Sequence, residues 1–203
     1  MAKNYEKLSA DYYNRQAARF ERSFDGFLAG FFKRYIVKQL DLETGAAVLD
    51  VGSATGKLLQ MLAQKSAIEG TGLDIAPRMT ELAQVTYPAF AFVTGSAMQL
   101  PFAAQQFDVI ICSASFHHFP EPERFLAEAL RTLKPGGRLV IAEIRIPVGR
   151  RLYNALIGRF SKEGDVKVYD FDELQQLLER ADFIRLRGRK QLQIQYFEAY
   201  KRQ

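Results

Sequence analysis

The chain has 203 residues, of which 48% are hydrophobic and 25% are charged. This balance is typical of one ordinary globular domain and excludes a wholly disordered chain. A single cysteine, Cys112, excludes an internal disulfide and with it a disulfide-built secreted scaffold, so we expect a cytoplasmic protein. The polar N-terminus predicts no signal peptide, and no apolar run reaches the roughly 20 residues that a membrane span requires.

The net charge of +5 is unevenly distributed along the chain. Residues 145–203 carry 13 basic and 8 acidic side chains, which is most of the excess. Such a bias either attracts anionic partners or is an ordinary solvated surface.

Residues 1–44 are predicted to form an N-terminal helical cap. Apolar side chains recur there at a spacing of three or four residues between residues 7 and 40, which indicates one buried helix face. Gly26 and Gly30 are expected to divide this stretch into two helices.

Residues 45–144 alternate between short strands and helices. The predicted strands are 47–51, 70–74, 90–93, 107–112 and 138–144, and the predicted helices are 57–64, 78–85 and 122–133. Strands that are apolar on both faces and separated by helices indicate a parallel sheet covered on both sides. The fold class is therefore α/β, with a Rossmann-like doubly wound sheet.

Residues 145–203 begin with a basic, aromatic-bearing stretch that ends near residue 169. Asp170 and Glu173 have the spacing of a capping box and predict a helix. Two strands are expected between residues 183 and 200, meeting near Arg189 and Lys190 in an antiparallel edge hairpin. We expect a single domain over residues 1–203, with a mostly parallel seven-stranded sheet. It would consist of the cap (1–44), a cofactor-binding core (45–144), and a substrate cap with the hairpin (145–203).

The turn after the first predicted strand, residues 50–57, reads Asp-Val-Gly-Ser-Ala-Thr-Gly-Lys. In a doubly wound sheet, ligands bind at such turns. A dinucleotide fingerprint that starts at Gly52 requires glycine where this chain has Ala54 and Lys57. A P-loop requires one more residue between Gly52 and Gly56, and serine or threonine after the lysine. Both phosphate-binding patterns therefore match poorly.

Two carboxylates end the first two predicted strands. Asp50 lies directly beneath the glycine turn, where it would repel a pyrophosphate. Asp74 follows Gly56 by 18 residues, a position from which a carboxylate accepts hydrogen bonds from ribose hydroxyls. The pair favours a ligand with a ribose, a cationic group and no phosphate, which describes S-adenosylmethionine.

Four stretches in this order resemble the class I S-adenosylmethionine-dependent methyltransferases, in particular the broad small-molecule subfamily. They are Val-Leu-Asp-Val-Gly-Ser-Ala-Thr-Gly at 48–56, Gly-Leu-Asp at 72–74, Leu-Pro-Phe with Phe-Asp at 100–108, and Leu-Lys-Pro-Gly-Gly at 133–137. The resemblance covers about residues 45–144 well and the flanks loosely.

The resemblance implies a set of cofactor-binding residues for S-adenosylmethionine and its product S-adenosylhomocysteine. Loop residues would approach the methionine part, Asp50 would order the loop and the amino end, and Asp74 would bind the ribose. The full set is Tyr13, Asp50, Gly52, Ser53, Ala54, Gly56, Asp74, Ile75, Met79, Ser96, Ala97, Met98 and Ser113. Two departures stand out: the family usually has a third glycine at Ala54 and often has an aspartate at Ser96.

The only histidines, His117 and His118, follow the fourth predicted strand beside the expected methyl position. One of them, with His118 ahead, either takes a proton from the acceptor or shapes the pocket. No metal is expected, because adjacent histidines lack a further ligand at suitable spacing. Cys112 lies inside a strand, where it is expected to be a buried apolar side chain rather than a nucleophile.

The expected substrate-binding residues lie at both ends of the chain. The aromatic N-terminal helix of relatives covers the cofactor, and the register between Tyr12 and Tyr13 is open. His117 is also expected at the substrate. Relatives build the substrate cap from the stretch that here contains Arg145, Arg150, Arg151, Tyr153 and Arg159, which suit an anionic acceptor or a solvated helix face.

The sequence thus predicts an enzyme that methylates an oxygen, nitrogen or carbon atom of a small molecule. The alternatives are an RNA or protein methyltransferase and a non-catalytic regulatory protein that binds S-adenosylmethionine. Nucleic acid and membrane partners are not expected, and the protein is expected to be a monomer or homodimer.

Overall fold

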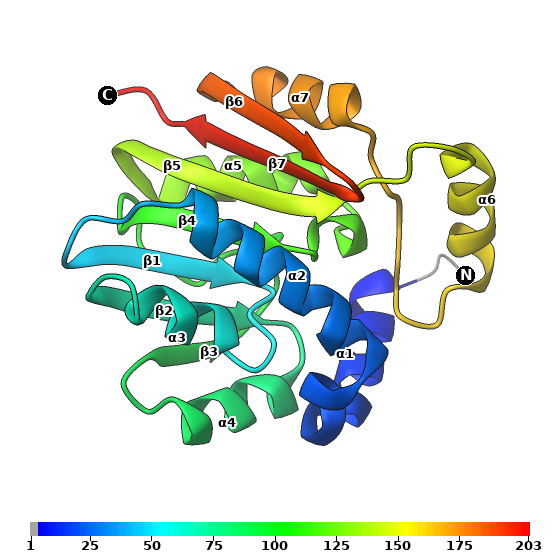
Figure 1. Cartoon of the computed structure of the whole chain (residues 1–203), viewed down its shortest axis with the longest axis horizontal. Helices are drawn as coiled ribbons and strands as arrows, with labels where there is room; N and C mark the ends of the chain where they lie inside the picture. The colour runs from blue at the N-terminus through cyan, green and yellow to red at the C-terminus, as the bar shows by residue number, and fades with distance from the viewer. Residues whose placement is uncertain (1–3) are drawn as a thin grey trace.

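The computed structural model describes residues 4–203, with the side chains of residues 158–160 left out. Its centre is one seven-stranded sheet in the order β3-β2-β1-β4-β5-β7-β6 (Figure 1). Strands β1 to β5 run parallel to one another, and β7 pairs antiparallel with both β5 and β6. The strands are β1 (Ala46–Val51), β2 (Ile68–Asp74), β3 (Ala91–Thr94), β4 (Phe107–Ser113), β5 (Leu133–Ile144), β6 (Ile184–Gln191) and β7 (Ile194–Tyr200). The predicted fold class is confirmed.

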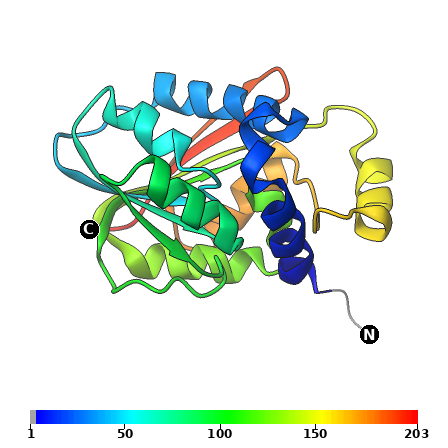
Figure 2. The same cartoon turned by 90° about the horizontal axis from the view of Figure 1, so that it is seen from below.

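Helices cover both faces of the sheet. Figure 2 shows α2 and α3 on one side and α5 on the other. The helices are α1 (Tyr5–Gln16), η1 (Ala17–Arg22), α2 (Phe24–Gln39), α3 (Lys57–Ala63), α4 (Pro77–Thr86), η2 (Phe116–His118), α5 (Pro122–Thr132), α6 (Arg150–Phe160) and α7 (Phe171–Arg180). No helix among residues 4–203 combines the length and the apolar character needed to cross a bilayer.

The sheet is apolar on both faces because each face packs against its own helices. Val48 and Ile111 are fully buried in a cluster with side chains of α2 and α3. Their chain neighbours, Leu49 and Ile110, point the other way into a cluster with α5 and α7. This alternation follows from the two-residue period of a strand, and it explains why the central strands are continuous apolar runs.

The strand order reverses between β1 and β4. From β1 the chain runs outward through β2 and β3, and it then returns to β4 on the other side of β1. The connections that leave β1 and β4 therefore diverge, which opens a crevice at the carboxyl ends of these strands. Helices α1 and α2 lie beside this end of the sheet (Figures 1 and 2).

The prediction for the N-terminal helices is wrong about where the chain breaks. Gly26 and Gly30 lie inside α2, and the break occurs at Ser23, whose Oγ accepts a hydrogen bond from the Gly26 amide (3.1 Å). Glycine is required at 26 for packing: a Cβ there would lie 2.0 Å from the Phe20 carbonyl oxygen. The glycine therefore allows close contact between η1 and α2.

The predicted hairpin turn is also misplaced. The strands meet at Leu192 and Gln193, not at Arg189 and Lys190, and Leu192 adopts a left-handed φ of 51°. The prediction rested on the alternation of polar and apolar side chains from Gln191 to Tyr196, and this alternation spans the turn. Of the two hairpin strands, only β6 lies at an edge of the sheet, because β7 lies between β5 and β6 and is buried along most of its length.

Candidate active site

A cavity of about 810 Å³, part of which is open to solvent, lies at the carboxyl ends of β1, β2 and β4. The turns after these strands form its floor, including Gly52, Asp74 and Ser113. The N-terminal helices form its roof, with Tyr13 from α1 and Lys33 from α2. Its place is the crevice where the strand order reverses, so the fold itself positions this pocket.

The glycine turn between β1 and α3 bends through left-handed backbone. Gly52 and Gly56 have φ angles of 76° and 78°. A Cβ on Gly52 would lie 2.2 Å from Ser115 Oγ, and one on Gly56 would lie 2.5 Å from the Phe92 ring. Both glycines are therefore required by the conformation and by close neighbours.

Ala54, the position of the missing third glycine, also has a left-handed φ of 47°. A residue with a Cβ pays roughly 1 kcal/mol for this conformation. The Ala54 amide donates to Asp74 Oδ2 (2.8 Å), which holds the turn in place. The departure from the family pattern is thus tolerated with local strain.

Asp74 links two turns from the floor of the pocket. Its Oδ2 accepts from the Ala54 amide, and its Oδ1 accepts from the Ala76 amide (2.9 Å). The side chain is buried, and burial raises the pKa of its carboxyl above the usual value even though the backbone amides favour the charged form. Asp74 therefore has a structural task that the sequence did not predict.

Unsatisfied buried polar atoms gather around this pocket. Of the six buried side-chain nitrogen or oxygen atoms without a hydrogen-bond partner in the described part of the chain, five belong to residues in or next to the cavity wall. The five atoms are Lys33 Nζ, Asp50 Oδ1, Ser53 Oγ, Ser113 Oγ and His118 Nδ1. Because buried polar groups in folded proteins are nearly always paired, this concentration indicates a site for a polar ligand.

Asp50 and Lys33 are the charged members of this set. Asp50 is 1% exposed, and burial raises its pKa to about 7, although nearby Lys33 favours its charged form. Lys33 is 5% exposed, and burial lowers the pKa of its amine despite Glu21, whose Oε1 lies 3.7 Å from Nζ. An acid and a cation thus lie buried near one another without a hydrogen bond.

Sequence reasoning missed Lys33. The side chain lies on the apolar face of α2, between buried Phe32 and Ile36. A lysine on the buried stripe of an amphipathic helix is unusual, because such side chains are almost never fully buried without a partner. That position was the signal that could have identified it.

Tyr13 and His118 form the polar end of the cavity. Tyr13 Oη and His118 Nε2 are 3.2 Å apart, and both side chains line the pocket. Burial, together with neighbouring His117, lowers the pKa of His118 to about 3, whereas burial raises that of Tyr13 well above 10. Tyr12 lies outside the lining, and its hydroxyl donates to Asp25 Oδ2 (3.0 Å).

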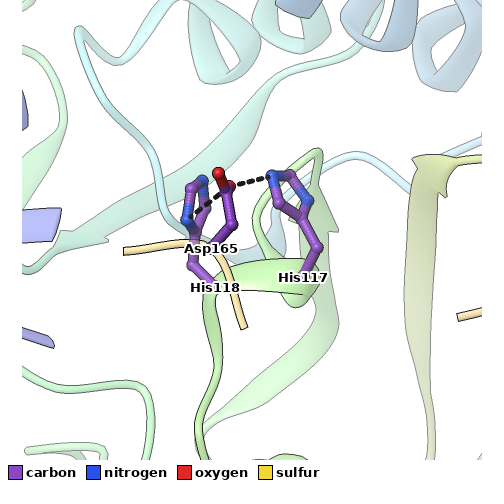
Figure 3. Close-up of side chains that lie close together, drawn as sticks. All are labelled: His117, His118 and Asp165. Atoms are coloured by element: carbon purple, nitrogen blue, oxygen red, sulfur yellow. Dashed lines mark ion pairs between the residues drawn. The ribbon is translucent and has the colours of Figure 1, made fainter. Parts of the chain in front are cut away.

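His117 lies behind His118 and does not line the pocket. Its Nδ1 is 2.9 Å from Oε1 of Glu143, a fully buried carboxylate on β5. Burial opposes the charged form of His117, but Glu143 and then Asp165 raise its pKa above the ordinary value. Asp165, from the segment between α6 and α7, lies between the two histidines (Figure 3). The spacing along the chain gave no sign of this carboxylate, which only the fold brings beside the histidines.

The structure brings about half of the predicted site residues to the cavity wall. Those that line it are Tyr13, Gly52, Ala54, Asp74, Ile75, Ala97, Met98, Ser113 and His118. Those that do not are Tyr12, Asp50, Ser53, Gly56, Met79, Ser96, His117, Arg145 and Tyr153.

Several of the second group have other partners. Ser96 Oγ pairs with Glu6 from α1, and Met79 packs in a small core cluster with Phe20. Arg145 donates to the Leu192 carbonyl (3.0 Å) at the turn between β6 and β7.

Among the basic residues of the expected substrate cap, Arg150 likewise has other partners, and Arg151 is exposed. Arg150 pairs with Asp170 (2.6 Å) and Glu173 (2.8 Å) at the start of α7. Tyr153 is 39% exposed on α6. The side chain of Arg159 lies outside the described residues.

Comparison with known proteins places these observations in a family. Residues 49–141 match a family model described as "Methyltransferase domain". A demethylmenaquinone methyltransferase of Paenarthrobacter aurescens is 34% identical over 131 residues, which cover 63% of this chain and 51% of the relative. One of Tropheryma whipplei is 35% identical over 140 residues, covering 66% and 58%. The chain spans about half the length of the curated relatives that it matches.

Solved structures share the fold. One belongs to a complex between the Trm112 methyltransferase activator of Haloferax volcanii and a methyltransferase, with a TM-score of 0.82, 19% identity, and coverage of 96% of this chain and 98% of the other. Another is phosphoethanolamine N-methyltransferase 2 of Haemonchus contortus with S-adenosyl-L-methionine, with a TM-score of 0.75, 13% identity, and coverage of 94% and 60%.

Proposed function

We propose that this chain, which belongs to the class I S-adenosylmethionine-dependent methyltransferases, transfers a methyl group from S-adenosylmethionine to a small-molecule acceptor. The observation that carries the proposal is the buried acid and cation, Asp50 and Lys33, near the reversal point of the sheet, where Asp50 Oδ1 and Lys33 Nζ have no hydrogen-bond partner in the described part of the chain. The demethylmenaquinone methyltransferases among the relatives act, by their name, on a small molecule, which supports an acceptor of that class.

The residues around the cavity fit this cofactor. Its methionine part ends in an ammonium and a carboxylate, which are complementary to Asp50 and Lys33 respectively. Lys33 Nζ and Asp50 Oδ1 have no hydrogen-bond partner in the described part of the chain, although Glu21 lies 3.7 Å from Lys33 Nζ. Lys33 lines the cavity and Asp50 lies directly behind its wall, next to Val51. Asp74, in the floor beneath the adjoining turn, retains carboxylate lone pairs for the ribose hydroxyls.

The bound cofactor supplies an activated methyl group, whose bond to sulfur breaks with its electron pair as the acceptor forms the new bond. Rate enhancement then comes largely from alignment, which is worth up to roughly 7–11 kcal/mol in well-oriented systems. The protein contributes by fixing the methionine part at Asp50 and Lys33 and by covering part of the cavity with α1 and α2, which limits the access of water.

The acceptor is proposed to bind between Tyr13 and the turn after β4. Phe119 and Pro120 offer apolar surface there, and Tyr13 and His118 provide the polar end. This combination fits an apolar molecule with an oxygen or nitrogen function. His118 is the better-placed candidate for a base because it lines the cavity, whereas His117 does not. Unchanged turnover after replacement of both histidines by asparagine would exclude a base role for either.

Two other functions remain as alternatives to be tested. RNA or protein as the acceptor predicts tight association with the macromolecule, and RNA affinity would fall steeply as salt is added. A regulatory protein would bind S-adenosylmethionine without turnover. The proposal includes a cytoplasmic location, as expected from the single cysteine, and a monomer or homodimer.

The direct test measures S-adenosylhomocysteine release with a panel of acceptors. The panel contains short-chain quinols, phenols, amines and carboxylic acids, with total RNA and a denatured protein extract as comparisons. Release that depends on one small-molecule class supports the proposal. Release with RNA or protein alone, or binding of the cofactor with no release for any acceptor, would refute it.

A further inference from the structure

His117, His118 and Asp165 form a compact cluster at the acceptor end of the pocket. The histidines follow β4 in η2, and Asp165 comes from the segment between α6 and α7. Asp165 Oδ1 lies 3.5 Å from His117 Nε2 and 3.3 Å from His118 Nδ1. Figure 3 shows the carboxylate between the two imidazoles, with both nitrogens turned toward it.

Two of the three ligand-atom separations in the cluster match the edges of a tetrahedral metal site. Bonds of about 2.0–2.2 Å from zinc to imidazole nitrogen and carboxylate oxygen, set at the tetrahedral angle, place neighbouring ligand atoms roughly 3.4 Å apart. The two measured separations lie on either side of this value. They exceed the distance of a good hydrogen bond. All three ligand atoms lie within 4.8 Å of one another.

Each of the three side chains is held by its other polar atom. His117 Nδ1 contacts the buried Glu143 carboxylate at 2.9 Å, and His118 Nε2 contacts Tyr13 Oη at 3.2 Å. Asp165 Oδ2 accepts from Ser161 Oγ at 2.6 Å. Metal-binding imidazoles are oriented in this way by hydrogen bonds from the nitrogen that does not bind the metal.

We propose that His117 Nε2, His118 Nδ1 and Asp165 Oδ1 bind a divalent transition metal of the zinc type. Two imidazoles and one carboxylate form the donor set of a site that keeps a fourth position open. Without a metal, His118 Nδ1 is buried and has no hydrogen bond in the described part of the chain, with only Asp165 Oδ1 at 3.3 Å, whereas a metal would bind this atom directly.

The open position would serve the acceptor. His118 lines the cavity, so a metal bound to it lies at the cavity wall. There it would polarise an acceptor oxygen and make its proton easier to lose, as Lewis-acid metals do. This role rests on the proposed function, whereas metal binding itself does not. In this proposal His118 is a metal ligand and not the base that the sequence suggested.

The test uses the full chain, free of tags and treated with a chelator. We expect calorimetry to show one Zn²⁺ per chain, and Co²⁺ to produce the strong visible absorption of a tetrahedral site. Asp165→Asn and His118→Asn should each weaken Zn²⁺ binding by more than about 100-fold, beyond the loss typical of a supporting residue. Asp172→Asn, which changes an exposed acid on α7, should bind as the wild type does.

X-ray absorption spectroscopy of the zinc-loaded wild type tests the ligand set without any variant. The proposal requires scattering from two imidazole rings. Failure of the wild type to bind Zn²⁺ or Co²⁺ stoichiometrically would overturn it, and the cluster would then be hydrogen-bonded only. Binding that persists in folded Asp165→Asn and His118→Asn proteins would overturn it too. Loss of methyl transfer with intact Zn²⁺ binding would instead count against the proposed function.

Discussion

Replacing Lys33 with methionine should separate the stability of the protein from its affinity for the cofactor. Lys33 is 5% exposed, and its ammonium has no hydrogen bond in the described part of the chain and lies 3.7 Å from Glu21 Oε1. Methionine has a similar length and no charge. Glu21 retains Lys57 (2.7 Å), so the substitution leaves no unpaired acid there.

The substitution should raise the stability of the ligand-free protein and lower its affinity for the cofactor product. Removing a buried, poorly paired cation should stabilise the ligand-free protein by about 1 kcal/mol, which raises the melting temperature by about 2–4 °C at this chain length. Losing a charge-assisted bond to the methionine carboxylate should weaken S-adenosylhomocysteine binding by about 2–3 kcal/mol, or about 30- to 150-fold.

Calorimetry and thermal melts measure both effects. Lys38→Met is the matched control, because Lys38 is an exposed lysine on the same helix. A second control is 5′-methylthioadenosine, which lacks the amino-acid part and should bind wild type and Lys33→Met equally well. Unchanged S-adenosylhomocysteine affinity in Lys33→Met, or an equal loss for both ligands, would refute the role given to Lys33.

Three further outcomes are expected. The pKa of Asp50 is raised to about 7 by burial, with Lys33 and Asp74 as the charged groups that act on it. The carboxyl is therefore mostly neutral below pH 7 and mostly charged above it. The affinity for S-adenosylhomocysteine, measured by calorimetry, should rise from pH 6 to pH 8. This dependence of affinity on pH should vanish in Asp50→Asn. Ala54→Gly should relieve the left-handed φ of 47° and raise the free energy of unfolding by about 0.5–1 kcal/mol in urea titrations; a decrease would show that the turn is not strained. Asp74→Ala should lower cofactor affinity by about 1.5–3 kcal/mol through the lost bonds to the ribose. It should also destabilise the fold, because the Ala54 and Ala76 amides lose their acceptor. An unaltered affinity in calorimetry would contradict the ribose role.

The sequence predicted the parts of the site that lie at strand ends. Asp74 and the turn at Gly52 follow buried apolar strands, and parallel strands bring their carboxyl ends to one edge of the sheet. Local pattern and topology together were enough to place these residues. The same reasoning placed His118 near the pocket, because it follows β4.

The residues that were missed reach the site from distant elements. Lys33 comes from α2 and Asp165 from an irregular segment, and no strand pattern connects either to the glycine turn. Their positions depend on how the N-terminal helices and the segment before α7 pack over the sheet. Arg145, a predicted substrate residue, lies away from the cavity wall for the same reason, since packing directs it to the Leu192 carbonyl.

The measurement that tests the account most directly is a calorimetric titration of the purified chain with S-adenosylhomocysteine, alongside NAD and ATP. The account predicts saturable 1:1 binding of S-adenosylhomocysteine that depends on both Asp50 and Lys33, and no binding of the two phosphorylated nucleotides at this site. Binding of NAD or ATP without binding of S-adenosylhomocysteine would contradict it.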